Sequence, residues 1–301
     1  MPEGHSLHRL ARGLHRTFAG QVVESSSPQG RFHSGAEILT GRVLEQAEAY
    51  GKHLFVTFEG DDVVHVHLGL YGTMAKARTP APEPRGAVRW RLVGDSWFAD
   101  LRGPTACDLV GPLGREGIIA RLGPDPLRAD AEPERARERI LGSRAPVGTL
   151  LMDQSVLSGV GNIYRAELLF RHQVSPFLEG RLLRAEVFDA MWADLVLLMN
   201  DGVRRGRIVT VDAADVDALS AMDVDRPSSD DPALDGGEDA PQIRRLRRST
   251  GVYVYRREGR PCVRCGIAVA TRDVQGRRLF WCPGCQRLPG QRRPRPRRST
   301  T

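Results

Sequence analysis

Residues 262–285 read CVRCGIAVATRDVQGRRLFWCPGC, two C-x2-C pairs with 16 residues between them. Pairs at this spacing can place four thiolates tetrahedrally around one Zn²⁺. Pro283-Gly284 and Gly266 supply turn chemistry for the two pairs, and the residues between them read as two strands joined by a turn. The stretch therefore predicts a zinc β-hairpin with one structural Zn²⁺, whose ligands would be Cys262, Cys265, Cys282 and Cys285.

Two structural disulfides are the alternative for these four cysteines. The N-terminal sequence MPEGHSLHRL has no apolar core of the kind that secretory signals carry. No stretch approaches the roughly 18 uncharged apolar residues of a membrane span. We therefore expect a cytoplasmic protein without a membrane partner, in which thiols stay reduced. The fifth cysteine, Cys107, is expected to be a small buried residue.

The rest of the chain divides by pattern into an α+β multidomain protein. Short alternating runs after an opening helix predict a β-sandwich or barrel over 1–115, and helical patterns follow a linker at 116–132. The expected helices are Ser6–Phe18, Glu134–Leu141, Val147–Gln154, Asn162–His172 and Ala185–Arg205, and the expected strands are Leu54–Phe58, Val63–Leu70, Val88–Leu92 and Trp97–Leu101. The expected domains are 1–115, 133–248 and the hairpin 249–286, with a connection near Gly114–Glu132 and a disordered basic tail at 287–301.

The charge distribution favours a polyanionic partner. The net charge is +7 and the isoelectric point is about 9.6, although Val211–Ala240 alone holds nine Asp, one Glu and a single Arg. Residues 210–242 are also rich in Ser, Pro and Gly, which predicts a mobile loop or linker. The remaining chain is strongly basic, as nucleic-acid-binding proteins are, or as any protein of an arginine-rich composition is. Among 44 basic residues only Lys52 and Lys76 are lysines.

Two further stretches have chemical potential. Asp153–Asn162 joins two helical patterns through Gly159, Gly161 and Asn162, and it is either a plain connection or an anion site at a helix N-terminus. At the other end of the chain, removal of Met1 would expose Pro2 as a secondary amine. Such an amine attacks an aldehyde-level carbon to give an iminium ion, and the neighbouring Glu3 is placed to move protons. Alone, Pro2 is also consistent with a chance early proline.

Six motifs in this order resemble the formamidopyrimidine-DNA glycosylase/endonuclease VIII family over residues 1–286. They are MPEG at 1–4, GKHL at 51–54, HLGLYG at 67–72, LGPDPL at 122–127, LLMDQSVLSGVGNIYRAELLF at 150–170, and YVYRREGRPCVRC with GRRLFWCPGCQ at 253–286. The resemblance implies an N-terminal β-sandwich, a helix–two-turn–helix domain and a zinc β-hairpin. It implies a monomer that binds double-stranded DNA, flips out an oxidised base, excises it and nicks the abasic strand by β,δ-elimination, as a nucleoid-associated enzyme of base excision repair.

The resemblance also implies a role for individual residues of this chain. Pro2 takes the position of the Schiff-base nucleophile, Glu3 that of the acid, and Lys52 that of a phosphate contact and proton donor in β-elimination. Arg277 takes the hairpin position that grips phosphates and is assigned to δ-elimination. The DNA contacts implied by the family are Asn162, Gly161, Arg121, Leu70 and Tyr71.

The branch of the family is indicated by two places in the sequence. Leu70-Tyr71 matches the pair with which endonuclease VIII proteins fill the space of the flipped base. The Met and the Arg-Phe pair of the formamidopyrimidine branch are missing, since 100–105 reads DLRGPT. Oxidised pyrimidines are therefore favoured over 8-oxoguanine. Gly69 stands where the endonuclease VIII pattern has Gln, so the contact to the opposite base is left open.

Two alternatives compete with this interpretation. A nonenzymatic zinc-ribbon protein that binds nucleic acid would explain the charge, the cysteines and the Gly-Asn turn, but neither MPEG nor the retained Lys52. A glycosylase that prefers formamidopyrimidine or 8-oxoguanine would explain the motifs but not Leu70-Tyr71.

Overall fold

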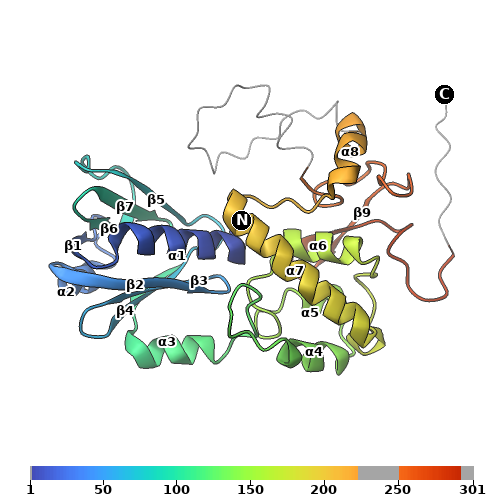
Figure 1. Cartoon of the computed structure of the whole chain (residues 1–301), viewed down its shortest axis with the longest axis horizontal. Helices are drawn as coiled ribbons and strands as arrows, with labels where there is room; N and C mark the ends of the chain where they lie inside the picture. Colours follow the sequence, from blue (N-terminus) through green and yellow to red (C-terminus); the bar gives the residue numbers. More distant parts are fainter. Residues whose placement is uncertain (1, 223–250, 293–301) are drawn as a thin grey trace. The chain divides into compact units, whose positions relative to one another are not determined.

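The computed structural model describes residues 2–222 and 251–292, and by its contacts the chain divides into two compact units (Figure 1). We call Met1–Ala136, Asp153–Gly161 and Gly202–Gly206 the N-terminal unit, and Arg137–Met152, Asn162–Asp201 and Arg207–Thr301 the C-terminal unit. None of the helices within the described ranges is both long and apolar enough to cross a lipid bilayer.

The N-terminal unit is a β-sandwich, as the sequence predicts. Its strand order is β5-β7-β6-β1-β2-β3-β4-β8, and β1 passes between the layers because Gln21, Val22 and Val23 pair with β2 while Glu24, Ser25 and Ser26 pair with β6. The strands are β1 (Gln21–Ser26), β2 (Arg42–Tyr50), β3 (His53–Phe58), β4 (Asp62–His67), β5 (Thr73–Arg78), β6 (Val88–Val93), β7 (Trp97–Arg102) and β8 (Ala106–Leu109).

The core of the sandwich forms because one face of each central strand is apolar. Leu54, Val56 and Phe58 alternate along β3, and their buried side chains join those of Trp90 and Leu101 from the other layer. Helix α1 (Gly4–Phe18) adds Leu7, Ala11, Leu14 and Phe18 at helical spacing. Figure 1 shows α1 between the layer of β5, β6 and β7 and the layer of β2, β3 and β4. Helices α2 (His33–Leu39) and α3 (Gly111–Ile119) complete the unit.

Most of the remaining elements are helical. They are α4 (Pro133–Leu141), α5 (Val147–Leu150), α6 (Asn162–Arg171), η1 (Gly180–Leu182), α7 (Ala185–Arg205), η2 (Ala213–Asp215) and α8 (Val216–Met222), followed by the hairpin of β9 (Ala270–Val274) and β10 (Arg277–Trp281). The hairpin pairs in register from Ala270 opposite Trp281 to Val274 opposite Arg277, as predicted. It contacts α6, and the side chain of Gln286 donates from Nε2 to the carbonyl of Val174 at 3.0 Å.

Several expected boundaries are wrong for local reasons. The helix expected over Val147–Gln154 ends at Leu150, because the carboxylate of Asp153 accepts from the amide of Ser155 at 2.9 Å and starts a turn. The strand expected over Val63–Leu70 ends at His67, where Gly69 adopts a positive φ of 68°.

Two expected connections are partly helical. The connection at Gly114–Glu132 begins inside α3, a helix that buries no side chain fully and so has little periodic signal. The loop expected at 210–242 begins with η2 and α8, because Val216 and Leu219 pack into the core of the C-terminal unit. The rest of that loop, 223–242, and the tail from 293 lie outside the described residues.

Candidate active site and metal centre

Glu3 is the buried acid at the start of α1, with 1 % of its surface exposed. Its Oε2 accepts a hydrogen bond from the amide of Gly161 at 3.0 Å, and the amide of Gly4 donates to the carbonyl of Gly159 at 2.8 Å. A β-carbon on Gly161 would lie 2.6 Å from Oε1 of Glu3, closer than such atoms approach. Glycine at 161 is therefore required for the carboxylate to reach this backbone.

Lys52 lies in the turn between β2 and β3 and contacts the same loop. Its Nζ donates to the carbonyl of Val160 at 2.6 Å, and Nε2 of Gln154 donates to that carbonyl at 3.0 Å. The carbonyl of Val160 and the amide of Gly161 belong to one peptide group, so Lys52 and Glu3 bind its two ends. The ammonium faces the negative end of the peptide dipole and the carboxylate faces the positive end, which is the favourable orientation for both charges.

Asp125 supports the turn that carries Lys52. Its fully buried carboxylate accepts from the amide of Gly51 at 2.7 Å and from the amide of Leu127 at 2.9 Å. Nε2 of His8, on α1, lies 2.6 Å from the same Oδ2 that binds Gly51. Asp125 lies in the motif LGPDPL, but no role was predicted from the sequence for Asp125 or His8. The available signal was an acidic residue placed between two prolines.

Three histidines line the sheet beside Lys52. Nδ1 of His53 lies 2.8 Å from Nε2 of His65, and the ring of His67 is centred 4.9 Å from that of His53. Burial, with a smaller effect of the neighbouring histidines, lowers the pKa of His53 to about 3. Burial likewise lowers the pKa of His65 to about 4, with His67 adding to the shift. These imidazoles are therefore neutral at pH 7.

The remaining predicted residues of the N-terminal unit occupy other positions. Pro2 is half-buried and directly precedes Glu3. Leu70 and Tyr71 lie on the loop between β4 and β5 and are 52 % and 86 % exposed. Arg121 is exposed just after α3, where its Nε donates to the carbonyl of Gly117 at 3.1 Å, and its charge contributes to the low pKa of His53.

Asn162 begins α6 in the C-terminal unit, and its amide is held from two sides. Nδ2 donates to the carbonyl of Arg278 at 2.8 Å, and Oδ1 accepts from the buried guanidinium of Arg165. Arg277 is exposed at the start of β10. The structure thus brings Asn162 to the hairpin that carries Arg277. It also identifies Arg165, which sequence reasoning missed because a charged residue on a helix usually indicates a solvent-facing position.

The four predicted metal ligands come together in the C-terminal unit. The sulfur atoms of Cys262, Cys265, Cys282 and Cys285 all lie within 4.8 Å of one another. Sγ of Cys262 is 3.8 Å from that of Cys285, and Sγ of Cys265 is 3.4 Å from that of Cys282. Bonds of about 2.3 Å from a tetrahedral zinc to sulfur fit such separations. The group can therefore hold a metal ion, and among the described residues no other cluster of this kind exists.

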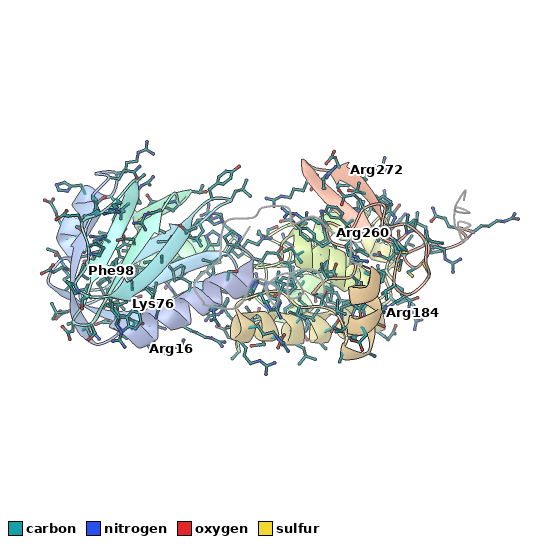
Figure 2. The ribbon with its side chains drawn as sticks, turned by 90° about the horizontal axis from the view of Figure 1, so that it is seen from above. Arg16, Lys76, Phe98, Arg184, Arg260 and Arg272 are labelled. Carbon is teal, nitrogen blue, oxygen red and sulfur yellow. The ribbon has the colours of Figure 1, made fainter. Side chains whose placement is uncertain are left out.

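Arginines extend along the four-cysteine hairpin. Figure 2 labels Arg272 on this hairpin, and its guanidinium lies over the ring of Phe177 at 5.7 Å. Arg278 is exposed on the paired strand β10 and forms a 3.1 Å ion pair with Glu258. The four-cysteine hairpin therefore presents several cations.

Solved structures show which class of protein has this fold. A structure of MutM in complex with DNA containing carbocyclic 8-oxo-G matches with a TM-score of 0.71, covering 95 % of this chain and 100 % of that chain at 20 % identity. The Lactococcus lactis Fpg in complex with DNA containing an abasic site matches with the same score, coverage and identity. The sandwich, the helical part and the four-cysteine hairpin are thus the architecture of the Fpg/MutM glycosylases.

Sequence comparison identifies the family. The formamidopyrimidine-DNA glycosylase N-terminal domain matches residues 1–107, and the formamidopyrimidine-DNA glycosylase H2TH domain matches 122–213. Endonuclease 8 1 of Mycobacterium tuberculosis is 49 % identical over 290 residues, which is 95 % of this chain and 100 % of that protein. Probable endonuclease 8 2 of Streptomyces coelicolor is 31 % identical over 97 % of this chain and 96 % of its own. The chain belongs to the formamidopyrimidine-DNA glycosylase family and is endonuclease VIII-like.

Proposed function

We propose that this protein is a bifunctional DNA glycosylase and abasic-site lyase that excises oxidised bases, pyrimidines in preference. Its family membership makes it a DNA glycosylase of base excision repair. The lyase step and the lesion preference are the parts that we add. The observation that carries the lyase step is the single peptide group of Val160 and Gly161, whose two ends bind Lys52 and Glu3 beside Pro2. The lesion preference rests on the exposed pair Leu70-Tyr71.

The proposed chemistry begins at the nitrogen of Pro2 after removal of Met1. This secondary amine has a pKa of about 8 in model peptides, so a useful fraction is unprotonated at neutral pH. Its electron pair forms a bond to C1′ of the nucleotide, while the bond from C1′ to the base breaks and the base leaves with a proton. Opening of the sugar ring gives an iminium ion, in which the C2′ proton becomes acidic. Loss of the C2′ proton then expels the 3′ phosphate by β-elimination.

Glu3 and Lys52 move the protons of this sequence. Glu3 assists ring opening by protonating the ring oxygen of the sugar. The hydrogen bond that its carboxylate accepts from the amide of Gly161 holds the side chain of Glu3 in place beside Pro2. Lys52 holds a phosphate and donates a proton in β-elimination, from a position fixed by the carbonyl of Val160. Arg277, on β10, grips the phosphate that leaves in δ-elimination.

Double-stranded DNA with an oxidised base or an abasic site is the proposed partner of a monomeric enzyme. The net charge of +7 supports a polyanionic partner, and several similar structures contain DNA. Asn162, Gly161 and Arg121 are the proposed backbone contacts, with Leu70 and Tyr71 as the wedge that fills the space of the flipped base. The exposure of this pair supports a role as the wedge, and its match to the endonuclease VIII pattern supports the preference for oxidised pyrimidines.

One structural Zn²⁺ is proposed for Cys262, Cys265, Cys282 and Cys285. All four positions are protein sulfur, so the ion would fix the hairpin and leave no open coordination position for chemistry. Elemental analysis should find one zinc per chain, and a chelator should abolish DNA cleavage together with the fold of the hairpin. Active, folded protein without zinc would contradict this part of the proposal.

A panel of duplexes with one lesion each tests the function. Base release and the ends left after nicking are measured separately for oxidised pyrimidines, formamidopyrimidine, 8-oxoguanine and a plain abasic site. We expect fastest release of the oxidised pyrimidines and phosphate at both ends of the gap. Faster release of 8-oxoguanine would favour the formamidopyrimidine branch, and binding without any release would favour a nonenzymatic DNA-binding protein.

A further inference from the structure

Two loops of the N-terminal unit meet beside the exposed pair Leu70-Tyr71. One is the loop Leu68–Gly72 between β4 and β5, closed by a hydrogen bond of 3.0 Å from the amide of Gly72 to the carbonyl of Leu68. The other is the turn between β7 and β8. They are joined where the amide of Thr105 donates to the carbonyl of His67 at 2.8 Å.

Residue 69 is the point at which these loops interlock. Gly69 has a positive φ of 68°, and a β-carbon there would overlap the hydroxyl oxygen of Thr105 and lie 3.2 Å from the β-carbon of Thr105. The side chain of Thr105 therefore occupies the space into which a side chain at 69 would extend. Residue 69, next to Leu70, has no side chain of its own, and the hydroxyl group beside it comes from Thr105 in the turn between β7 and β8.

The hydroxyl of Thr105 is available to a ligand. The residue is exposed, and none of the hydrogen bonds described for residues 2–222 and 251–292 involves its side chain. A hydroxyl group rotates and can either donate or accept. Its neighbour across the loop, Leu70, offers only carbon atoms and is 52 % exposed.

We infer that Thr105 is a DNA-contacting residue, whose hydroxyl binds the base opposite the excised one; this rests on the proposed function. When a wedge enters the stack, the base left without a partner exposes donors and acceptors that the leucine side chain and the face of the tyrosine ring cannot satisfy. The hydroxyl of Thr105 lies at the base of the wedge and satisfies one of them. Because a threonine hydroxyl pairs with either a donor or an acceptor, excision should be similar opposite all four bases.

The test compares Thr105→Val with wild type in single-turnover excision. Three duplexes carry the same lesion opposite a natural thymine, opposite an apolar isostere of thymine (difluorotoluene), or opposite a tetrahydrofuran residue that has no base. We expect Thr105→Val to be about three- to tenfold slower opposite thymine, the range that one neutral hydrogen bond gives. It should equal wild type opposite the isostere and the base-free residue, and Thr105→Ser should keep the wild-type rate opposite thymine.

The controls separate this inference from the proposed function. Thr73→Val removes another exposed threonine hydroxyl, at the start of β5, and should leave all three rates unchanged. Equal rates of Thr105→Val and wild type opposite thymine would overturn the inference while the enzyme remained active. A uniform loss on all three duplexes would also overturn it, since the effect would not involve the opposite base. An inactive wild type would instead remove the proposed function.

A second measurement checks the interlocked packing. Gly69→Ala brings the cost of a positive φ in any background, but the overlap with the threonine side chain exists only when Thr105 is present. The melting temperature should therefore fall further when Gly69→Ala is made in wild type than when it is made in Thr105→Gly. Equal falls in the two backgrounds would show that residue 105 does not fill the space at 69 and would overturn the inference.

Discussion

Lys52 and Lys76 both donate from an ammonium group to a backbone carbonyl of the N-terminal unit, yet their surroundings differ. Lys52 binds the carbonyl of Val160, whose peptide group binds the carboxylate of Glu3 at its other end. Lys76, on the edge strand β5, binds the carbonyl of Gly13 at 3.1 Å and the hydroxyl of Thr17 at 2.6 Å (Figure 2). Its Nζ lies 5.1 Å from the centre of the Trp97 ring.

The difference shows that scarcity of lysine does not by itself indicate catalysis. Burial, with a smaller effect of Arg16, lowers the pKa of Lys76, but its partners all belong to α1 and the sheet and no acid is among them. A compact donor is needed there to join α1 to β5. At Lys52 the same type of donor lies beside Glu3 and Pro2. The two sites should therefore respond in opposite ways to the same substitution.

Lys52→Arg should cause the largest change. Arginine keeps the charge but is planar, bulkier and effectively never deprotonated, so it holds a phosphate without transferring a proton. We expect strand nicking to fall by about 100-fold or more, the usual contribution of a positioned acid or base. The free energy of unfolding should change by less than about 1 kcal/mol. Single-turnover nicking and thermal unfolding measure the two quantities, and unchanged nicking would assign Lys52 to structure alone.

Glu3→Gln should come next and act on base excision. Glutamine still accepts from the amide of Gly161, so the loop stays in place, but it has no proton to give. Excision from an oxidised-pyrimidine duplex should fall by about 100-fold. Single-turnover assays measure it, with Glu24→Gln on β1 as an exposed control that should be silent. If both variants excise at the wild-type rate, the proton comes from another group.

Lys76→Arg should reverse the pattern of Lys52→Arg. A planar guanidinium cannot reproduce the two hydrogen bonds that the compact Nζ makes to Gly13 and Thr17 beside the Trp97 ring. We expect a loss of about 1 kcal/mol in the free energy of unfolding, the order of one or two neutral hydrogen bonds. Excision and nicking at a temperature well below unfolding should match wild type. If Lys76→Arg lost activity but not stability, Lys76 would serve catalysis as Lys52 is expected to, and the assignment of Lys76 to structure alone would be wrong.

Acidification should lower the free energy of unfolding, and the buried histidines beside Lys52 should account for part of that loss. His53 and His65 have pKa values of about 3 and about 4 in the fold, below the roughly 6.5 of an unfolded chain. Between these pKa values the unfolded chain binds more protons than the folded protein. The contribution of the neutral histidines to the free energy of unfolding is therefore fully present above pH 6.5 and is lost as the pH falls toward 4. Lys52 and Arg121 oppose protonation of His53, while Asp108 favours that of His65.

Unfolding of wild type and His53→Gln between pH 7 and pH 5 measures this change. The variant should lose less stability over that interval, because one buried imidazole no longer titrates. The exposed His15 on α1 provides the matched control, and His15→Gln should keep the wild-type slope. A His53→Gln slope as steep as that of wild type would contradict the linkage.

The sequence predicts much of this architecture, because several signals in it are local. Two C-x2-C pairs specify the hairpin, and the periodicity of Ala185–Arg205 specifies α7 to the residue. Strands β1, β2, β5 and β8 of the sandwich were not predicted. The exposed edge strand β5, for example, carries almost no buried side chain from which a pattern could be read. Its place depends on pairing with β7, which is a tertiary property.

The candidate site was predictable in its residues and not in its geometry. The resemblance to the family indicated Glu3, Lys52 and Gly161. Only the three-dimensional structure shows that Glu3 and Lys52 bind the two ends of one peptide group. Asp125 was missed for the same reason, since it binds the amide of Gly51, which is distant in the chain. Arg165 was missed because a charged residue on a helix usually faces solvent, whereas this one is buried against Asn162. Likewise, Gly69 reads as a missing side chain in the sequence, whereas the structure places Thr105 in that space.

Borohydride trapping on DNA with a single abasic site shows which nitrogen of the protein forms the iminium ion. Reduction fixes the iminium as a covalent bond, and mass spectrometry of the digested complex locates the modified residue. We predict one cross-link, at the nitrogen of Pro2, in wild type and in Lys52→Arg alike, and none when an N-terminal extension blocks that amine. A cross-link at Lys52, or one that survives the blocked N-terminus, would contradict the account.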